Sequence, residues 1–71
     1  MPQDLEAERA VLGAMLQEKE AIGEVVRVLR DAGAAAFQVE RHQQLYDVLV
    51  KLYVDDQPMD GVVIKDELVR R

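Results

Sequence analysis

Glu8 and His42 are the two residues of this chain whose side chains could together do acid–base chemistry, because a carboxylate and an imidazole can share a proton. Helical projection places Glu8 near the centre of an apolar face, between Leu5 and Leu12. It places His42 on the apolar face of a later helix. We therefore hypothesise a contact between Glu8 and His42 that joins the two helices, with Arg41 as a competing partner.

Two simpler interpretations stand beside this hypothesis. The carboxylate of Glu8 could instead meet free amide groups and water at the start of its own helix. A formed pair of Glu8 and His42 is in turn interpreted as a structural latch rather than a proton-transfer site, because no further catalytic group accompanies it.

The remaining residues offer few groups that could act as a nucleophile or bind a metal ion or cofactor. The sequence contains no cysteine, serine or threonine, which removes thiolate and hydroxyl nucleophiles and cysteine metal sites. Its four glycines stand singly, unlike the clustered glycines of a phosphate-binding loop. Asp55, Asp56 and Asp60 lack the alternating ligands and terminal glutamate of a calcium loop and are interpreted as a solvated turn. We expect no catalytic, cofactor-binding or metal site in this chain.

Length and charge limit the partners that the chain can have. With 71 residues, the chain is expected to bury only about 60% of its unfolded surface, and to gain roughly 3–5 kcal/mol from its core. Self-association or another protein partner is therefore expected. The net charge of −5 opposes binding to nucleic acid or to anionic membranes, and no apolar run is long enough to span a bilayer. We expect a cytoplasmic protein with no membrane contact.

Apolar residues at helical spacing predict an all-α bundle of about four helices, in one domain over residues 1–71. Asp4 is placed to cap the first helix and Asp60 the last. Residues 31–36 form a connector that can carry a short helical turn. The first helix is expected over about residues 5–17, and the second carries the apolar pattern from Ile22 to Leu29. The third carries the pattern from Leu45 to Tyr53, which can begin as early as Val39, and the last runs through Val62, Ile64, Leu68 and Val69.

Glycine and aromatic residues suggest how the helices pack. Gly13 interrupts a good helix, which indicates either a tolerated surface position or a close approach by another backbone, and the close approach is favoured. Phe37 and Tyr53 are predicted to lie in the core, whereas Tyr46 lies at the edge of the apolar face of the third helix. The candidate protein interface consists of the exposed side of that helix and the following turn, with Tyr46, Asp55, Asp56 and Pro58.

Two groups of residues follow the order and spacing of a known family. The first contains Pro2, the block Leu5-Glu6-Ala7-Glu8, the block Ala10-Val11-Leu12-Gly13, and Leu16. The second contains Phe37, His42, Gln44-Leu45-Tyr46, Leu49, Leu52, Pro58, Asp60, Val62, Ile64 and Leu68. Together they resemble the N-terminal domain of the bacterial replicative DNA helicases of the DnaB family, over almost the whole chain.

The chain departs from the family pattern in three places. Gln38 stands where members commonly carry an aromatic residue, and the connector before Phe37 is unusually rich in alanine. Val63 stands where members commonly carry threonine, so Asp60 has to cap the last helix alone.

The resemblance implies a helical collar domain on a hexameric ring, which pairs with copies of itself and offers a surface to primase. A helicase loader is a further implied partner. In such helicases, ATP and Mg are bound by a C-terminal RecA-like motor domain, which also makes the main contacts with DNA. The chain is then expected to be a non-catalytic fragment of a longer bacterial protein that associates with the nucleoid during replication.

Three other interpretations of the chain are compatible with its sequence. The helicase-binding domain at the C-terminus of primase shares this helical architecture, although the Glu-Ala-Glu block near Met1 argues against it. A free-standing helical adaptor could mimic the helicase collar. A small helical enzyme is the least favoured, because the sequence offers no nucleophile, metal set or cofactor loop.

Overall fold

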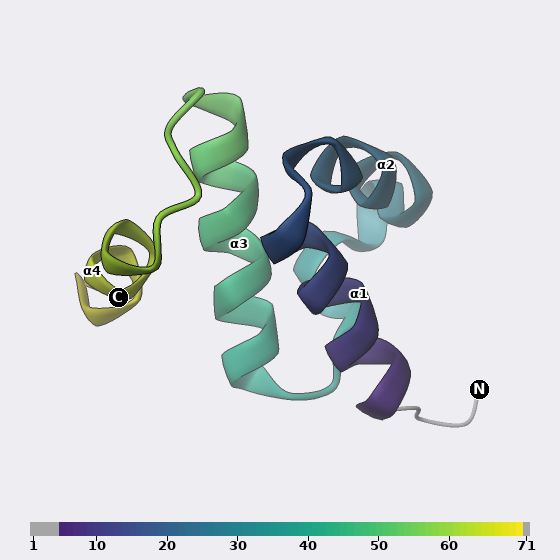
Figure 1. Cartoon of the computed structure of the whole chain (residues 1–71). Helices are drawn as coiled ribbons and strands as arrows, with labels where there is room; N and C mark the ends of the chain where they lie inside the picture. Colours follow the sequence, from purple (N-terminus) through teal and green to yellow (C-terminus); the bar gives the residue numbers. More distant parts are fainter. Residues whose placement is uncertain (1–4, 71) are drawn as a thin grey trace.

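The computed structural model describes residues 5–70, which form an all-α bundle (Figure 1). No strand occurs in this range, so the predicted fold class is confirmed. The predicted cap Asp4 lies outside the described residues. The elements are α1 (Leu5–Gln17), α2 (Lys19–Leu29), the 3₁₀ helix η1 (Arg30–Ala36), α3 (Glu40–Val54) and α4 (Gly61–Arg70).

Helix α3 is the centre of the bundle. It runs between α4 on one side and α1 and α2 on the other (Figure 1), and it packs against each of these helices and against η1. Its apolar residues recur every three or four positions, so they form one face that meets the neighbouring helices. The helix therefore supplies the surface on which the rest of the chain folds.

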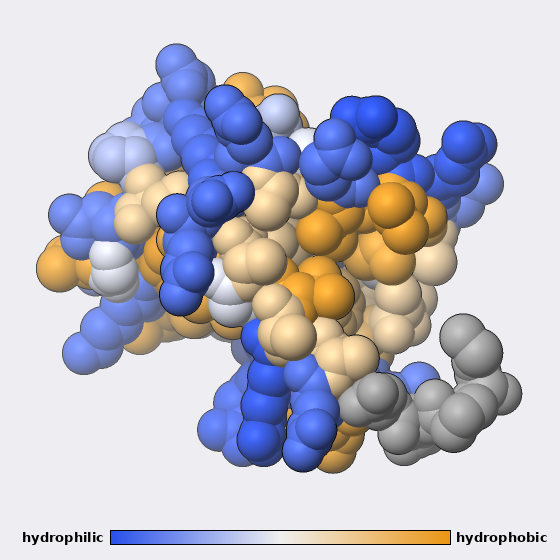
Figure 2. Space-filling model, turned by 45° about the vertical axis from the view of Figure 1, so that its right-hand side comes forward, coloured by the Kyte–Doolittle hydropathy of each residue, from blue (hydrophilic) through white to orange (hydrophobic). Residues whose placement is uncertain are grey.

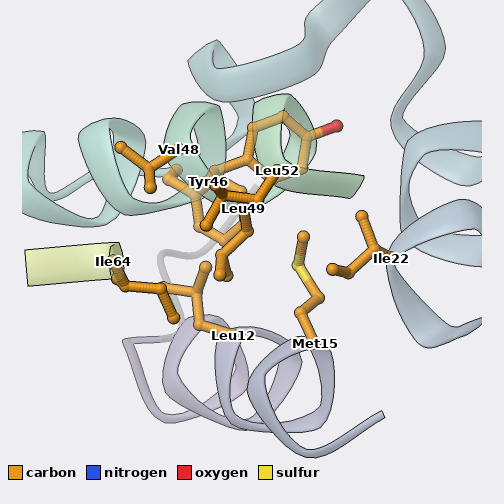
Figure 3. Close-up of a cluster of buried hydrophobic side chains, with 9 residues drawn as sticks. Leu12, Met15, Ile22, Tyr46, Val48, Leu49, Leu52 and Ile64 are labelled. Carbon is orange, nitrogen blue, oxygen red and sulfur yellow. The ribbon is translucent and has the colours of Figure 1, made fainter. Parts of the chain in front are cut away.

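The core is a single cluster of aliphatic and aromatic side chains (Figure 3). Met15 of α1, Ile22 of α2 and Leu49 of α3 are fully buried in it, and Ile64 brings α4 onto the same cluster. Its buried members are Leu12, Met15, Ile22, Phe37, Tyr46, Val48, Leu49, Leu52 and Ile64.

The turn after α3 is closed by backbone hydrogen bonds. The amide of Gln57 donates to the carbonyl of Leu52 at 2.8 Å, and the amide of Asp56 donates to that of Tyr53 at 3.1 Å. This is a Schellman arrangement, in which Asp56 takes the left-handed position with φ 55°. Lys19 pairs with Asp56 at 2.7 Å, so the start of α2 holds this turn.

The start of α4 is fixed by the predicted cap. The amide of Val62 donates to the carboxylate oxygen Oδ1 of Asp60 at 2.8 Å, and α4 begins at Gly61. The connector predicted to carry a short helical turn is η1.

The close approach at a glycine occurs at Gly23, not at Gly13. A Cβ atom added at Gly13 would meet nothing within 4 Å, so the predicted packing role of Gly13 is wrong. A Cβ atom added at Gly23 would lie 2.7 Å from the hydroxyl oxygen of Tyr53, because the aromatic side chain reaches from α3 across α2.

No helix within residues 5–70 has the length and apolar character that crossing a bilayer requires. The longest, α3, has 15 residues, whereas a span needs about 20.

Gly13→Ala should raise the free energy of unfolding by about 0.5–1 kcal/mol, because alanine is the better helix former and its methyl group meets open space. Gly23→Ala is the matched control and should gain less, because Tyr53 has to move. Urea denaturation followed by circular dichroism measures both. A Gly13→Ala variant that is less stable than the native chain would contradict this packing.

Asp60→Ala should lower the free energy of unfolding by about 0.5–2 kcal/mol, because the amide of Val62 loses its acceptor. Asp60→Asn keeps a side-chain oxygen at the cap and should remain close to the native chain. The same denaturation experiment separates the two variants, and equal losses would show that the cap is not what stabilises α4.

Candidate functional site

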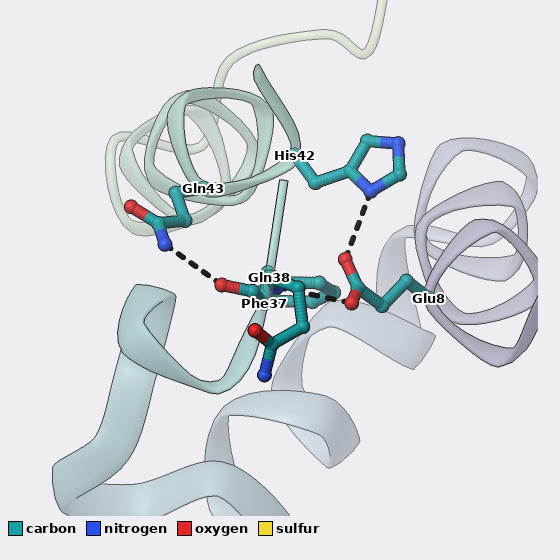
Figure 4. A network of polar contacts seen from close by, with 5 residues as sticks. All are labelled: Glu8, Phe37, Gln38, His42 and Gln43. Carbon is teal, nitrogen blue, oxygen red and sulfur yellow. Dashed lines mark hydrogen bonds and ion pairs between the residues drawn. The ribbon is translucent and has the colours of Figure 1, made fainter. Parts of the chain in front are cut away.

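Glu8 and His42 meet between α1 and the start of α3 (Figure 4). The Nδ1 atom of His42 lies 2.9 Å from Oε1 of Glu8, so the predicted contact between these side chains is confirmed. The second oxygen, Oε2, accepts a hydrogen bond of 3.0 Å from the backbone amide of Gln38. Arg41, the competing partner, is exposed and makes no ion pair within residues 5–70.

These contacts explain why a carboxylate can lie on an apolar face. The side chain of Glu8 is only 10% exposed, and burying a charge is costly unless hydrogen bonds replace its water. The alternative, in which the carboxylate is solvated at its own helix end, does not describe this structure. Glu8 is bonded across the bundle to the segment before α3 and to α3 itself.

The hydrogen bonds also fix the charge of the carboxylate. The bond from His42, followed by the bond from the amide of Gln38, lowers the pKa of Glu8 below its ordinary value. Glu8 is therefore ionised at neutral pH and can only accept hydrogen bonds. It follows that Nδ1 of His42 carries the proton, while Nε2 points away from Glu8 (Figure 4).

The segment between η1 and α3 is held from both sides. The amide group of the Gln43 side chain donates to the carbonyl oxygen of Phe37 at 2.7 Å, while Glu8 holds the next residue, Gln38. The ring of Phe37 is buried, as predicted, and packs at 5.3 Å between centroids against the tilted ring of Tyr46. The polar contacts thereby position an aromatic part of the core.

This arrangement suits structural support better than catalysis. The hydrogen bonds of this pair join only the carboxylate, the imidazole and the backbone amide of Gln38, and none of these groups is a hydroxyl or thiol nucleophile. Within residues 5–70, no three metal-ligating side chains gather. We name the contacts of Glu8 with His42 and Gln38 the Glu8 latch.

The candidate interface residues differ in whether their side chains are buried or exposed. Tyr46 is 5% exposed, so its predicted role at an interface is wrong for this chain; the ring fills the space beside Phe37 instead. Burial raises the pKa of the Tyr46 hydroxyl, with a smaller contribution from Asp47. Tyr53, predicted to lie in the core, is 37% exposed.

The other three candidate residues lie in the turn after α3. Asp55, Asp56 and Pro58 are exposed, and the hydrogen bond from Lys19 lowers the pKa of the Asp56 carboxyl. Their role in binding a protein stays a prediction.

Several contacts have no signal in the sequence. The side chain of Gln43 and the backbone amide of Gln38 both make hydrogen bonds in the segment before α3. Hydrophobic periodicity does not report either bond. The pairing of Lys19 with Asp56 links residues 37 positions apart.

The chain matches the model of the DnaB-like helicase N-terminal domain over residues 1–71. It belongs to this family. The family assignment places the chain with the helicase rather than with the primase of the alternative reading, and it accords with the resemblance carried by the Glu8 block and by Phe37 and His42.

Relatives named "Replicative DNA helicase DnaB" align with nearly the whole chain. The protein from Mycobacterium leprae is 44% identical over 70 residues, which is 99% of this chain and 11% of the relative. That from Leifsonia xyli is 38% identical over 97% of the chain and 14% of the relative. That from Rhodothermus marinus is 39% identical over 97% of the chain and 7% of the relative. No solved structure gave a significant match.

We expect acidification to lower the free energy of unfolding of this DnaB-like domain, because the Glu8 carboxylate becomes protonated. Because the pKa of Glu8 is lowered in the folded chain, the latch stabilises the fold above the ordinary value of 4.5. This contribution is lost as the pH falls below 4.5 and through the folded pKa. Glu8→Gln should therefore be less stable than the native chain at neutral pH and should show a shallower loss on acidification.

Urea denaturation at a series of pH values measures this difference. Glu6→Gln is the matched control, because Glu6 is an exposed glutamate of the same helical turn. It should follow the native profile. Identical acid limbs for Glu8→Gln and the native chain would contradict the latch.

Proposed function

We propose that this chain is a non-catalytic interaction domain of a hexameric replicative DNA helicase, and that it contributes to ring assembly and docks primase during DNA replication. The observation that carries the proposal is the match of residues 1–71 to the N-terminal helicase domain, in relatives that are named replicative helicases. The chain spans only 11% and 14% of the first two relatives. The proposal assigns the motor to a part of the protein outside this chain.

In this proposal, ATP and Mg are bound and DNA is mainly contacted by that motor domain. The acidic charge of −5 would keep DNA away from the collar, because like charges repel at a distance. Primase and a helicase loader are the protein partners besides other copies of the chain. The assembly would act in the bacterial cytoplasm, at the nucleoid during replication.

Exposed apolar side chains support a role in protein contacts. Val28, Val54 and Val69 are each more than 70% exposed, so their side chains are available to a partner surface. Figure 2 turns the side with α1 and α2 forward and shows hydrophobic surface between hydrophilic patches. A hollow of about 250 Å³ between these helices is lined by Val11, Glu24, Val25, Val28 and Leu29.

Sedimentation equilibrium of the chain alone, and with the C-terminal domain of primase from the same organism, tests the proposal. We expect self-association that rises with concentration, or a mixed complex, because a core this small leaves apolar surface uncovered. Asp55→Lys should weaken the mixed complex about fivefold if the turn after α3 is the docking surface, as for an exposed charge pair worth about 1 kcal/mol. Asp31→Lys, at an exposed position of η1, is the matched control. A strict monomer that ignores primase would contradict the proposal.

A further inference from the structure

A groove lies at the end of the bundle where α1 and α3 both begin. It has a volume of about 630 Å³, within the range of about 300–1,000 Å³ that ligand pockets occupy, and it is open to solvent. Apolar side chains from three helices and from the segment before α3 form its floor: Leu5, Val39, Leu45 and Leu68. Of these, Leu5 is 43% exposed.

Two arginines flank this apolar floor. Arg9 of α1 and Arg41 of α3 line the groove and are exposed. Neither makes an ion pair within residues 5–70, and the same holds there for Arg30 and Lys65, which lie outside the groove. In a chain of net charge −5, the groove is therefore a local positive site beside apolar surface.

The buried carboxylate of Glu8 makes no ion pair with either arginine. Both oxygens of Glu8 are occupied, one by Nδ1 of His42 and the other by the amide of Gln38. His42 also lines the groove, with Nε2 turned away from Glu8 (Figure 4). Among the residues that the structure describes, neither guanidinium group has a carboxylate partner, so both can pair with an external anion.

We propose that this groove binds an acidic amphipathic helix of a partner protein. Aliphatic side chains of the partner would cover Leu5, Leu45 and Leu68, while carboxylates at its flanks would pair with Arg9 and Arg41. A helix laid into an apolar groove is a common mode of recognition, and guanidinium forks match carboxylate geometry.

Phosphate groups fit this groove less well than carboxylates on an apolar helix. Nucleic acid is held by many cations at once, and two arginines on an acidic chain provide too few. The apolar floor would also stay uncovered against a sugar–phosphate backbone. A partner that offers both leucine-like side chains and carboxylates satisfies both parts of the groove.

Fluorescence anisotropy with two labelled peptides tests the proposal. The first is an amphipathic helix of about 20 residues with leucine at i, i+3, i+4 and i+7 and flanking glutamates; the second carries glutamine in place of each glutamate. We expect the glutamate peptide to bind the 71-residue chain more tightly, and added salt to weaken its binding selectively. Equal affinity for the two peptides would overturn the proposal.

Paired variants assign the binding to the groove. Arg9→Gln with Arg41→Gln should weaken binding of the glutamate peptide about two- to tenfold, as expected for two exposed ion pairs, and leave the glutamine peptide unchanged. Arg27→Gln with Arg30→Gln removes two exposed arginines of α2 and η1 outside the groove and should have no effect. Leu5→Gln should weaken both peptides. An equal loss from the two arginine pairs would overturn the assignment.

Amide chemical shifts provide a test on the native chain, which does not depend on how any variant folds. Shifts on adding the glutamate peptide should concentrate at residues 5, 9, 39, 41, 45 and 68. Shifts confined to α2 would overturn the proposal. A single-stranded oligonucleotide, or a second copy of the chain, that bound with the same dependence on Arg9 and Arg41 would also overturn it, because the groove would then serve another ligand.

Discussion

The burial of the Glu8 carboxylate is the constraint that determines how α1 and the segment before α3 meet in this small bundle. A buried carboxylate requires donors, and the donors here come from α3 and from the segment that precedes it. Satisfying Glu8 therefore fixes where the chain enters α3. That entry point sets the position of Phe37 against Tyr46, and so connects a polar contact to the aromatic end of the core. It also places His42 on the wall of the groove next to Arg41.

The latch matters because the core is small. Within residues 5–70, nine buried apolar side chains form the core between the helices, and α3 is in contact with every one of the other elements. A domain of this size has a narrow margin of stability, so individual polar contacts at helix ends count for more than they would in a larger protein. The cap at Asp60 and the turn held by Lys19 and Asp56 serve α4 and α2 in the same way. The exposed side chains of Val28, Val54 and Val69 lie outside this core, and a partner can cover them.

Periodicity and capping chemistry were sufficient to predict the helices, the connector and the Asp60 cap, because these features depend on residues close in sequence. The pairing of Glu8 with His42 was also within reach, since each polar side chain lay on an apolar face and needed a partner. The packing of Gly13, Tyr46 and Tyr53 was predicted wrongly for one reason. Which residues of α1 and α3 meet a neighbour depends on where the other helices pack against them, and spacing along the chain does not contain those positions.

The protonation of the imidazole of His42 tests the latch most directly. A two-dimensional NMR spectrum that correlates the ring nitrogens with the ring protons distinguishes the two neutral forms of histidine. With Glu8 ionised and accepting from Nδ1, the neutral ring should carry its proton on Nδ1, and Glu8→Gln should allow the other form to appear. A native chain whose neutral His42 carries its proton on Nε2 would contradict the account, because Nδ1 would then have no hydrogen to donate to the carboxylate.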